Sequence, residues 1–287
     1  WQGSCILGTT DTPTIVSDEP RGTVADVKFI IESVKPYLGV IPLSDVKSVW
    51  CGIRPLAAKL PEPGANVSTD HAGETAVSTQ EVVREHMIDV DPVHRVVSIT
   101  GGKWTTFRKI AWDAVEALKG SGFLSQPVAP SVTEDMKLVG GHTWSEATIP
   151  NLKAAVRDIL GSSLAPLIKP EVEERWVHAF GDRATAVAAV AASMASAKGS
   201  PLEPLAVAQP ITAAEIRYCC EREHCCTISD YLQRRSRLAF LDVAEAVKVI
   251  PQVAEVMQRC HGWSSSVRKH MEEEARRSML QFTAAAQ

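Results

Sequence analysis

Three absences narrow the classes of protein to which this 287-residue chain can belong. No apolar run approaches the ~20 residues of a transmembrane helix; the closest stretch, the alanine-rich segment 184–194, is only weakly hydrophobic. The net charge is −4 and the pI is near 6.1, so the basic excess typical of nucleic-acid-binding proteins is missing. The sequence begins without an initiator methionine and without a signal or transit segment. Its first ten residues already read as a strand. Because domains rarely begin so abruptly, we expect the C-terminal portion of a longer protein.

Cysteine is present in an odd number, seven, without a secretory context, so we expect free thiols in a reducing compartment. Five candidate ligands are close together: Cys219, Cys220, His224, Cys225 and Cys226. Their spacing does not match a zinc site, because no Cys-x-x-Cys pair occurs. They also lie in a predicted helix that opens with the capping box Thr212-x-x-Glu215, and cysteine is often buried in such positions. We therefore predict no metal site here.

The order of expected elements predicts two domains. Up to residue 120 the chain reads as strands (1–10, 46–53, 82–90 and 96–100) that alternate with helices (24–35 and 107–118). Residues 120–141 are loop-like, and from residue 150 the apolar spacing is helical. The expected helices are 152–160, 170–180, 183–198, 213–225, 229–240, 243–260 and 263–282. We predict a partial α/β domain at 1–120, a linker at 121–149, an all-α domain at 150–287, and a frayed tail at 283–287.

The stretch 98–108 (Ser-Ile-Thr-Gly-Gly-Lys-Trp-Thr-Thr-Phe-Arg) places two glycines between a strand and a helix. Such a turn aims backbone N–H groups and the positive end of the helix dipole at whatever lies in front. Gly101 and Gly102 would let a ligand approach the backbone, and Lys103 adds a positive charge. The pattern favours an anionic or electron-rich ligand. An ordinary glycine-containing connection with a surface lysine explains it equally well.

Two other segments carry candidate polar residues. Arg54 follows an apolar run and precedes Pro55, which holds its backbone extended and suits it to bind a carboxylate or phosphate. A structural salt bridge is the alternative. The turn at 8–13 is either the edge of a site or an ordinary capped turn. His86, two residues after Arg84, is expected to be structural. The basic run at 234–237 is either a solvated, salt-bridged face or a contact for an anionic partner.

Three segments, in order, resemble the quinone-linked, FAD-dependent glycerol-3-phosphate dehydrogenases of mitochondria. They are Gly-Thr-Thr-Asp at 8–11, Gly-Ile-Arg-Pro-Leu at 52–56, and Thr-Gly-Gly-Lys-Trp-Thr-Thr-Phe-Arg at 100–108. Residues 83–86 and 230–240 also resemble family segments, so the resemblance spans most of the chain. The family opens with a Gly-x-Gly-x-x-Gly unit that holds the ADP half of FAD, and no such motif occurs here. The chain therefore resembles the C-terminal portion.

The resemblance implies a fold and a reaction. The fold would be part of an FAD/substrate domain of the glutathione-reductase or D-amino-acid-oxidase type, followed by an all-α domain. The reaction would oxidise sn-glycerol 3-phosphate to dihydroxyacetone phosphate and pass electrons to a quinone. The implied cofactor-binding residues are Gly101, Gly102, Lys103, Trp104, Thr105 and Thr106. The implied substrate-binding residues are Arg54, Arg84, Lys103, Thr10 and Asp11, with Arg54 also catalytic.

The resemblance further implies a mitochondrial protein associated peripherally with the inner membrane, with a homodimer as one arrangement that it allows. It does not assign the general base. Two other functions stay open: a related FAD oxidoreductase of an amino or hydroxy acid, and a catalytically incomplete helical interaction fragment. We expect the chain by itself to be incomplete and inactive.

Overall fold

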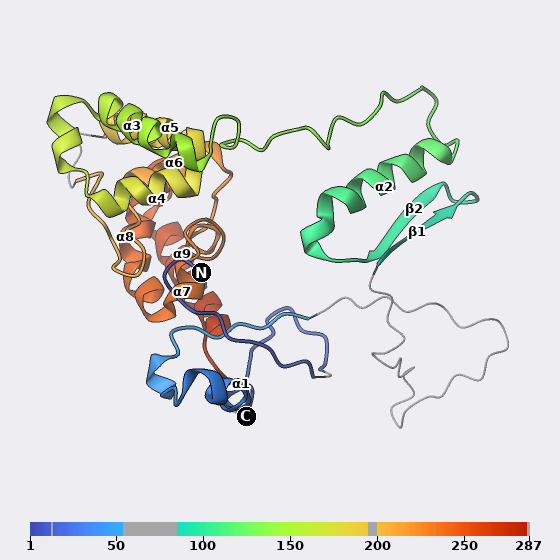
Figure 1. Cartoon of the computed structure of the whole chain (residues 1–287), viewed down its shortest axis with the longest axis horizontal. Helices are drawn as coiled ribbons and strands as arrows, with labels where there is room; N and C mark the ends of the chain where they lie inside the picture. Colours follow the sequence, from blue (N-terminus) through green and yellow to red (C-terminus); the bar gives the residue numbers. More distant parts are fainter. Residues whose placement is uncertain (13, 54–84, 195–199, 286–287) are drawn as a thin grey trace. The chain divides into compact units, whose positions relative to one another are not determined.

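The computed structural model describes residues 1–12, 14–53, 85–194 and 200–285 (Figure 1). By its internal contacts the chain divides into two compact units. The first combines residues 1–53 with 137–287 and is helical; the second comprises residues 54–136 and holds a hairpin and one helix. These compact units do not test the predicted functional domains, which are a partial α/β domain at 1–120, a linker at 121–149 and an all-α domain at 150–287. Those domain boundaries stay a prediction.

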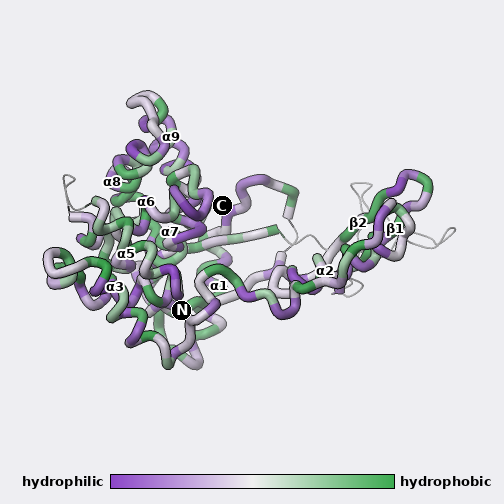
Figure 2. The backbone as a smooth tube through the Cα atoms, turned by 90° about the horizontal axis from the view of Figure 1, so that it is seen from above, coloured by the Kyte–Doolittle hydropathy of each residue, from purple (hydrophilic) through white to green (hydrophobic). Residues whose placement is uncertain are grey.

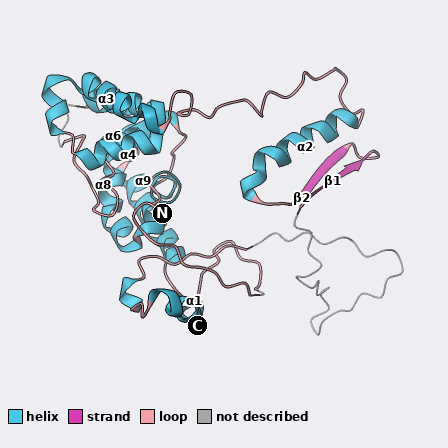
Figure 3. Cartoon of the chain, in the orientation of Figure 1, coloured by secondary structure: helices cyan, strands magenta, loops and turns pink. Residues whose placement is uncertain are grey.

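In the described residues of the first unit the regular elements are helices, joined by loops (Figure 3). Its α-helices are α1 (Val24–Leu38), α3 (Ile149–Leu164), α4 (Pro170–Phe180), α5 (Ala184–Ser193), α6 (Ala213–Arg222), α7 (Leu238–Leu241), α8 (Val243–His261) and α9 (Ser265–Met279). Its short turns are η1 (Leu43–Asp45), η3 (Glu146–Thr148), η4 (Ala165–Leu167), η5 (Gly181–Arg183) and η7 (Leu280–Phe282), and η6 (Asp230–Arg235) is a π-helix. These positions confirm the helices predicted from residue 150 onward, with shifted ends, except that the helix predicted at 229–240 is divided into η6 and α7 by Arg237, which has a positive φ of 59°.

The core of this unit follows from apolar spacing on single helices. In α8, the buried positions 246, 249, 250, 253, 254 and 257 fall on one face at helical spacing. This helix starts where the Asp242 side chain accepts a hydrogen bond from the Glu245 amide (2.9 Å) and ends at Gly262 in the left-handed region. Trp176 of α4 is fully buried in the same core. Polar and apolar segments alternate along the helices in Figure 2.

The two strands expected at 1–10 and 46–53 do not form, so those predictions are wrong. A strand needs a neighbouring strand for its backbone hydrogen bonds, and none of the described segments supplies one for either run. Both segments instead pack on the helices: Trp1 and Trp50 make edge contacts with Phe240, at ring-centroid distances of 6.4 and 5.2 Å. The Val49 amide donates to the Phe282 carbonyl (2.9 Å).

The C-terminal tail is also not frayed as far as residue 285, which corrects that expectation. The Ala285 amide donates to the Gly22 carbonyl (2.8 Å), and the Val24 amide donates to the Ala285 carbonyl (3.2 Å). Thr23 and Ala285 thereby form a parallel bridge. The beginning and the end of this unit are thus joined by backbone hydrogen bonds just before α1 begins.

The second unit contains β1 (His86–Asp91), β2 (Val96–Gly101), the 3-10 turn η2 (Trp104–Thr106) and α2 (Phe107–Gly120). The strands pair antiparallel, with His86 opposite Gly101, and they form the only sheet in the described ranges. The strand predicted at 82–90 is confirmed over 86–90, while Glu85 is not part of it and residues 82–84 lie outside the described residues. The strand predicted at 96–100 and the helix predicted at 107–118 are confirmed. In the part that the structure describes, the α/β alternation predicted over residues 1–120 is reduced to α1, which confirms the helix predicted at 24–35, and to one hairpin with α2.

Candidate functional site

The turn between β2 and α2 has the local geometry predicted from its glycines. β2 ends at Gly101, and Gly101 and Gly102 both have positive φ angles, 77° and 87°. Lys103 returns to an extended conformation before η2 and α2 begin. The Thr106 amide and hydroxyl both donate to the Lys103 carbonyl at 2.9 Å. No side chain caps the start of η2 or of α2, so the helix start presents backbone N–H groups outward.

Gly102 is required by packing as well as by backbone conformation. A Cβ atom at residue 102 would lie 2.8 Å from Ile110 Cδ1 and 3.1 Å from His86 Cβ. The turn therefore lets α2 lie close against the beginning of β1. Together with the φ of 87°, this close approach explains why a residue with a side chain does not fit here.

The residues after the glycines form an exposed group at the start of the helix. Lys103, Trp104, Thr105 and Thr106 are all exposed, and Trp104 is 87% exposed. Trp104 stacks on Phe107 at a ring-centroid distance of 5.7 Å. Lys103 forms no ion pair with any described residue. The turn thus offers a cation, two hydroxyls and an aromatic ring beside uncapped N–H groups, which suits contact with an anionic or electron-rich ligand.

His86, next to this turn, has a structural role, as expected. Its Nε2 lies 2.9 Å from Asp113 Oδ2 on α2, and Lys109 Nζ lies 2.6 Å from Asp113 Oδ1. The hydrogen bond from Lys109, supported by that from His86, lowers the pKa of Asp113 below its usual range. The carboxylate therefore stays ionised and ties the first residue of β1 to the middle of α2.

Thr10 and Asp11 belong to the other unit, near the start of α1. The Thr10 side chain hydrogen-bonds to Asp26, whose pKa is lowered mainly by hydrogen bonds from the Thr23 side chain and backbone. Thr23 and Asp26 form a capping box at the α1 N-terminus, with the Thr23 amide donating to Asp26 Oδ2 at 2.9 Å. Thr10 thus helps to close a helix start, while Asp11 lies exposed beside it.

The predicted site residues fall into three groups. Gly101 to Thr106 are contiguous in the hairpin unit, and Thr10 and Asp11 are adjacent in the helical unit. Arg54 and Arg84 lie outside the described residues. The substrate-binding role predicted for Arg54, Arg84, Lys103, Thr10 and Asp11 stays a prediction.

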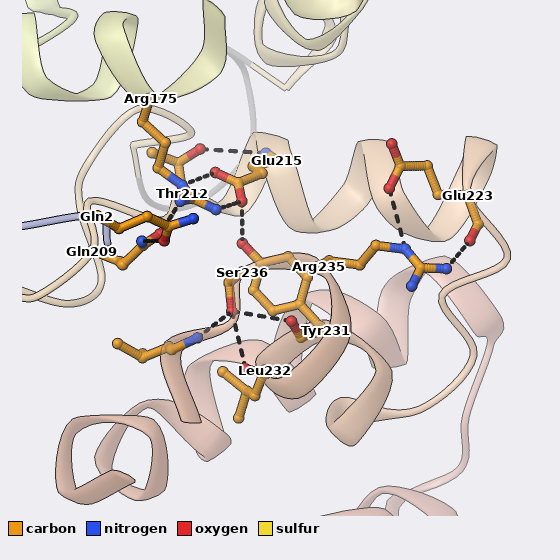
Figure 4. Close-up of polar contacts among 11 residues, drawn as sticks. Gln2, Arg175, Gln209, Thr212, Glu215, Glu223, Tyr231, Leu232, Arg235 and Ser236 are labelled. Atoms are coloured by element: carbon orange, nitrogen blue, oxygen red, sulfur yellow. Dashed lines mark hydrogen bonds and ion pairs between the residues drawn. The ribbon is translucent and has the colours of Figure 1, made fainter. Parts of the chain in front are cut away.

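The helical unit contains a buried charged network that the sequence did not reveal (Figure 4). Arg175 of α4 meets the Glu215 carboxylate of α6 in a two-pronged ion pair, with Nε–Oε2 at 2.8 Å and Nη2–Oε1 at 2.5 Å. The Tyr231 hydroxyl donates to Glu215 Oε1 (2.9 Å), and Glu215 and Tyr231 are fully buried. Arg175 also donates to the Gln209 side chain, which in turn contacts Gln2.

Two charged groups stabilise each other in this network. Burial works against the guanidinium charge, but the Glu215 carboxylate outweighs it and raises the pKa of Arg175 above its usual value. Burial and the same carboxylate raise the pKa of Tyr231, which keeps its hydroxyl protonated as a donor. The expected capping box at 212–215 is only half formed: Thr212 accepts from the Glu215 amide, but the carboxylate turns to Arg175. No local sequence pattern signals this pair, because its two members lie on different helices.

The basic run at 234–237 is a salt-bridged face. Arg234 pairs with Asp230 (2.8 Å), and Arg235 pairs with the Glu223 carboxylate (3.2 Å) and donates to the Glu223 carbonyl. Arg237 has a positive φ of 59° and separates the π-helix η6 from α7. Two of the three arginines are therefore engaged by the protein itself.

The cysteine cluster spans the end of α6. The helix stops at Arg222 rather than continuing to residue 225, because His224 takes a positive φ of 50°. All seven cysteines are free thiols. Among the described residues, no group of three or more His, Cys, Asp or Glu side chains is arranged to hold a metal ion.

Comparison with known proteins agrees with the motifs. Residues 131–268 match the family described as the C-terminal domain of alpha-glycerophosphate oxidase. The mitochondrial glycerol-3-phosphate dehydrogenase SDP6 of Arabidopsis thaliana is 32% identical over 288 residues, which cover 98% of this chain and 42% of the relative. Mitochondrial glycerol-3-phosphate dehydrogenase of Homo sapiens is 33% identical over 284 residues, which cover 96% of this chain and 35% of the relative.

In sequence this chain is similar to mitochondrial glycerol-3-phosphate dehydrogenases. It spans less than half the length of the curated relatives that it matches. In fold it is similar to the glycerol-3-phosphate dehydrogenase from Bacillus halodurans complexed with FAD, with a TM-score of 0.65 and 21% identity, over 92% of this chain and 46% of that chain. In the part of the chain that the structure describes, no helix has both the length and the apolar character to cross a bilayer.

Proposed function

We propose that this chain is part of an FAD-dependent glycerol-3-phosphate dehydrogenase, which oxidises sn-glycerol 3-phosphate to dihydroxyacetone phosphate and passes the electrons to a quinone. The observation that carries the proposal is the strand–Gly101–Gly102–Lys103–helix turn, in a chain that is 32–33% identical to such enzymes over 96–98% of its length. The chain alone is incomplete for this activity, because it contains no Gly-x-Gly-x-x-Gly motif for the ADP half of FAD.

The residues at the turn fit the ring end of the cofactor. Two positive-φ glycines, an uncapped helix start and the exposed Lys103 together favour a group that gains negative charge. FAD bound here would accept the hydride that leaves C2 of the substrate. The protein's contribution would be to hold Gly101 and Gly102 against the ring edge and to place Lys103 and the hydroxyls of Thr105 and Thr106 beside it.

The substrate phosphate would be bound by cations from several segments. A phosphate dianion is best neutralised by two or three positive groups, and arginine binds it through two parallel hydrogen bonds. In this proposal Arg54 binds the substrate at the reacting end, and Arg84 and Lys103 supply the remaining charge. The family resemblance also assigns a substrate-binding role to Thr10 and Asp11.

The location of the protein follows from its relatives. Both relatives described above carry the word mitochondrial in their names. We infer a mitochondrial protein that meets the inner membrane peripherally, where a quinone acceptor is available. A homodimer belongs to the same proposal.

The test is substrate turnover by the full-length protein, with a soluble dye or a short-chain quinone as acceptor. We expect acceptor reduction with sn-glycerol 3-phosphate and none with glycerol or D-amino acids, because the site is built for a phosphate dianion. Turnover of a D-amino acid or a 2-hydroxy acid without turnover of glycerol 3-phosphate would assign the protein to a different FAD oxidoreductase.

A further inference from the structure

Two histidine–aspartate pairs lie in the hairpin unit, one at each end of the hairpin. His86 Nε2 on β1 lies 2.9 Å from Asp113 Oδ2 on α2. His94 Nδ1, in the turn between the strands, lies 2.6 Å from Asp91 Oδ2 at the end of β1. The exposed fractions of the side chains are 20% and 23% in the first pair and 75% and 38% in the second. The two pairs have the same chemistry, so their surroundings decide what each of them can do.

The first pair lies beside the glycine turn, and the second does not. His86 is the β1 partner of Gly101 in the antiparallel register. A Cβ atom on Gly102 would lie 3.1 Å from His86 Cβ, so the backbone of the turn passes directly against this residue. Asp91 is opposite Val96, at the other end of the same strands. At about 3.4 Å per residue, these six-residue strands place the two ends roughly 17 Å apart.

The Asp113 carboxylate is held from two sides. Lys109 Nζ, one helical turn earlier on α2, lies 2.6 Å from Asp113 Oδ1, while His86 approaches Oδ2. Lys109 in turn lies over the ring of Trp112, 4.0 Å from its centroid. The hydrogen bond from Lys109, with that from His86, lowers the pKa of Asp113, so its carboxylate stays ionised. A charged acceptor binds its donors more strongly than a neutral one, which strengthens the contact between strand and helix.

Few other contacts hold the turn in one orientation. The Thr106 amide and hydroxyl donate to the Lys103 carbonyl and close the turn from within. Neither η2 nor α2 has a side-chain cap. Gly102 also packs against Ile110, which is an apolar contact without directional preference. Among the described residues, the bond between His86 and Asp113 is the one side-chain hydrogen bond that joins a strand of the hairpin to α2.

We propose, on the basis of the function proposed above, that Asp113 is a positioning residue for FAD: through His86 it sets the orientation of the turn at residues 101–106. Uncapped N–H groups bind a ligand tightly only if the loop that carries them is already ordered, because ordering a loop on binding costs free energy. His86 fixes the end of β2 through its pairing with Gly101, and Asp113 fixes His86 to the middle of α2. Both sides of the turn are thereby held by the folded unit before the cofactor binds.

The experiment measures the dissociation constant of FAD for the full-length protein, stripped of cofactor, from the change in flavin fluorescence on binding. His86→Ala removes the hydrogen bond to Asp113 and should weaken FAD binding by about tenfold, as for the loss of one hydrogen bond to a charged group. His86→Gln keeps an N–H donor near the place of Nε2 and should bind FAD within about threefold of wild type. The matched control His94→Ala breaks the other pair and should leave the dissociation constant unchanged. Circular dichroism at the assay temperature shows that each variant is folded.

A double-mutant cycle tests whether the two residues act together. Asp113→Ala should weaken FAD binding about as much as His86→Ala, and the double variant should bind no more weakly than either single variant. Hydrogen exchange of the FAD-free protein gives a second readout. Amides 102–105 should exchange faster in His86→Ala than in wild type or in His94→Ala, because the turn has lost its link to α2.

Several results would overturn the proposal. Wild-type FAD affinity in His86→Ala, or equal losses in His86→Ala and His94→Ala, would show that the pair only stabilises the hairpin. Additive losses in the cycle would show that Asp113 does not act through His86. If an alanine variant fails to fold, Asp113→Asn, which keeps an acceptor oxygen but not the charge, takes its place with a smaller loss expected. Failure of the proposed function is a separate outcome, seen as wild-type protein that binds FAD without turning over sn-glycerol 3-phosphate. Wild-type protein that binds no FAD would overturn both proposals.

Discussion

The helical unit (residues 1–53 and 137–287) and the hairpin unit (residues 54–136) differ in how far their side chains are buried. All buried apolar residues of the described chain belong to the helical unit, with Val27 and Ile31 in α1 and the rest between residues 156 and 282. In the described part of the hairpin unit, no residue is buried, and α2 packs on β1 and β2 with one partly covered face. The helical unit therefore has its own hydrophobic core, while the hairpin unit has an exposed glycine turn at residues 101–106.

The charged groups of the two units also differ, because those of the helical unit are paired where they are buried and Lys103 of the hairpin unit is exposed. Buried charges in the helical unit are paired, as in Arg175 with Glu215 and in Arg157 with Glu173 at 2.6 Å. At the glycine turn, Lys103 is exposed and forms no ion pair with the described residues. Paired buried charges specify a fold, whereas an unpaired cation beside uncapped N–H groups suits a ligand. The predictions below test this contrast, from the largest expected effect to the smallest.

The largest effect is expected in the helical unit. Glu215→Gln would leave Arg175 buried without its counter-charge, so the free energy of unfolding should fall by about 3–5 kcal/mol. The measurement is urea denaturation followed by far-UV circular dichroism. Glu221→Gln on the same helix removes an exposed partner of Arg217 and should change stability by at most about 0.5 kcal/mol. Equal effects of the two variants would contradict the structural role assigned to the buried pair.

The next effect concerns catalysis by the full-length protein. Arg54→Ala should remove about 2–4 kcal/mol of transition-state stabilisation, as expected for the loss of one key electrostatic donor. The measurement is kcat/KM for sn-glycerol 3-phosphate, and the exposed Arg277→Ala on α9 is the control. Wild-type kinetics for Arg54→Ala would remove this residue from the site.

A smaller effect is expected at the turn itself. Gly102→Ala adds a Cβ that meets Ile110 and the His86 side chain at a φ of 87°, so the hairpin unit should lose about 1–3 kcal/mol. Amide exchange across residues 86–120 measures that loss. Gly120→Ala, at the end of α2, meets no atom within 4 Å and should be close to neutral. A neutral Gly102→Ala would show that the turn has room to rearrange.

The smallest effect is expected for the exposed cation. Lys103→Ala should lower the two-electron midpoint potential of the flavin in the full-length protein by roughly 10–20 mV, the equivalent of about 0.5–1 kcal/mol for one partly solvated charge. The measurement is a dye-coupled redox titration. Lys119→Ala, at the other end of α2 and paired with Glu116, should leave the potential unchanged. A shift of the same size in both variants would point to a general effect of net charge.

Local patterns predicted what local forces determine. The spacing of apolar residues predicted α4 from Pro170 to Phe180 and α8 from Val243 onward, because a single face of each helix is buried. The two glycines predicted the turn at residues 101–102, because glycine has no Cβ atom and adopts a positive φ without steric cost. The cofactor-binding role of this turn was inferred from the family resemblance.

The errors arose where distant partners decide the structure. Residues 1–10 and 46–53 have strand-like sequences, but a strand also needs a neighbour, and their packing partner is Phe240. The tail is held by Gly22 and Val24, far away in sequence, so its position at the C-terminus was a poor guide. The buried pair of Arg175 and Glu215 joins two helices 40 residues apart, which no local pattern can reveal.

The central claim is that the Gly101–Thr106 turn contacts the flavin, while the helical unit is stable by itself. Hydrogen exchange measured on the full-length protein with and without FAD tests it most directly. We predict that FAD slows the exchange of amides 102–105 and leaves α6 and α8 unchanged, because these N–H groups precede the first hydrogen-bonded amide of the uncapped helix start. Equal exchange of amides 102–105 in the two forms would contradict the account.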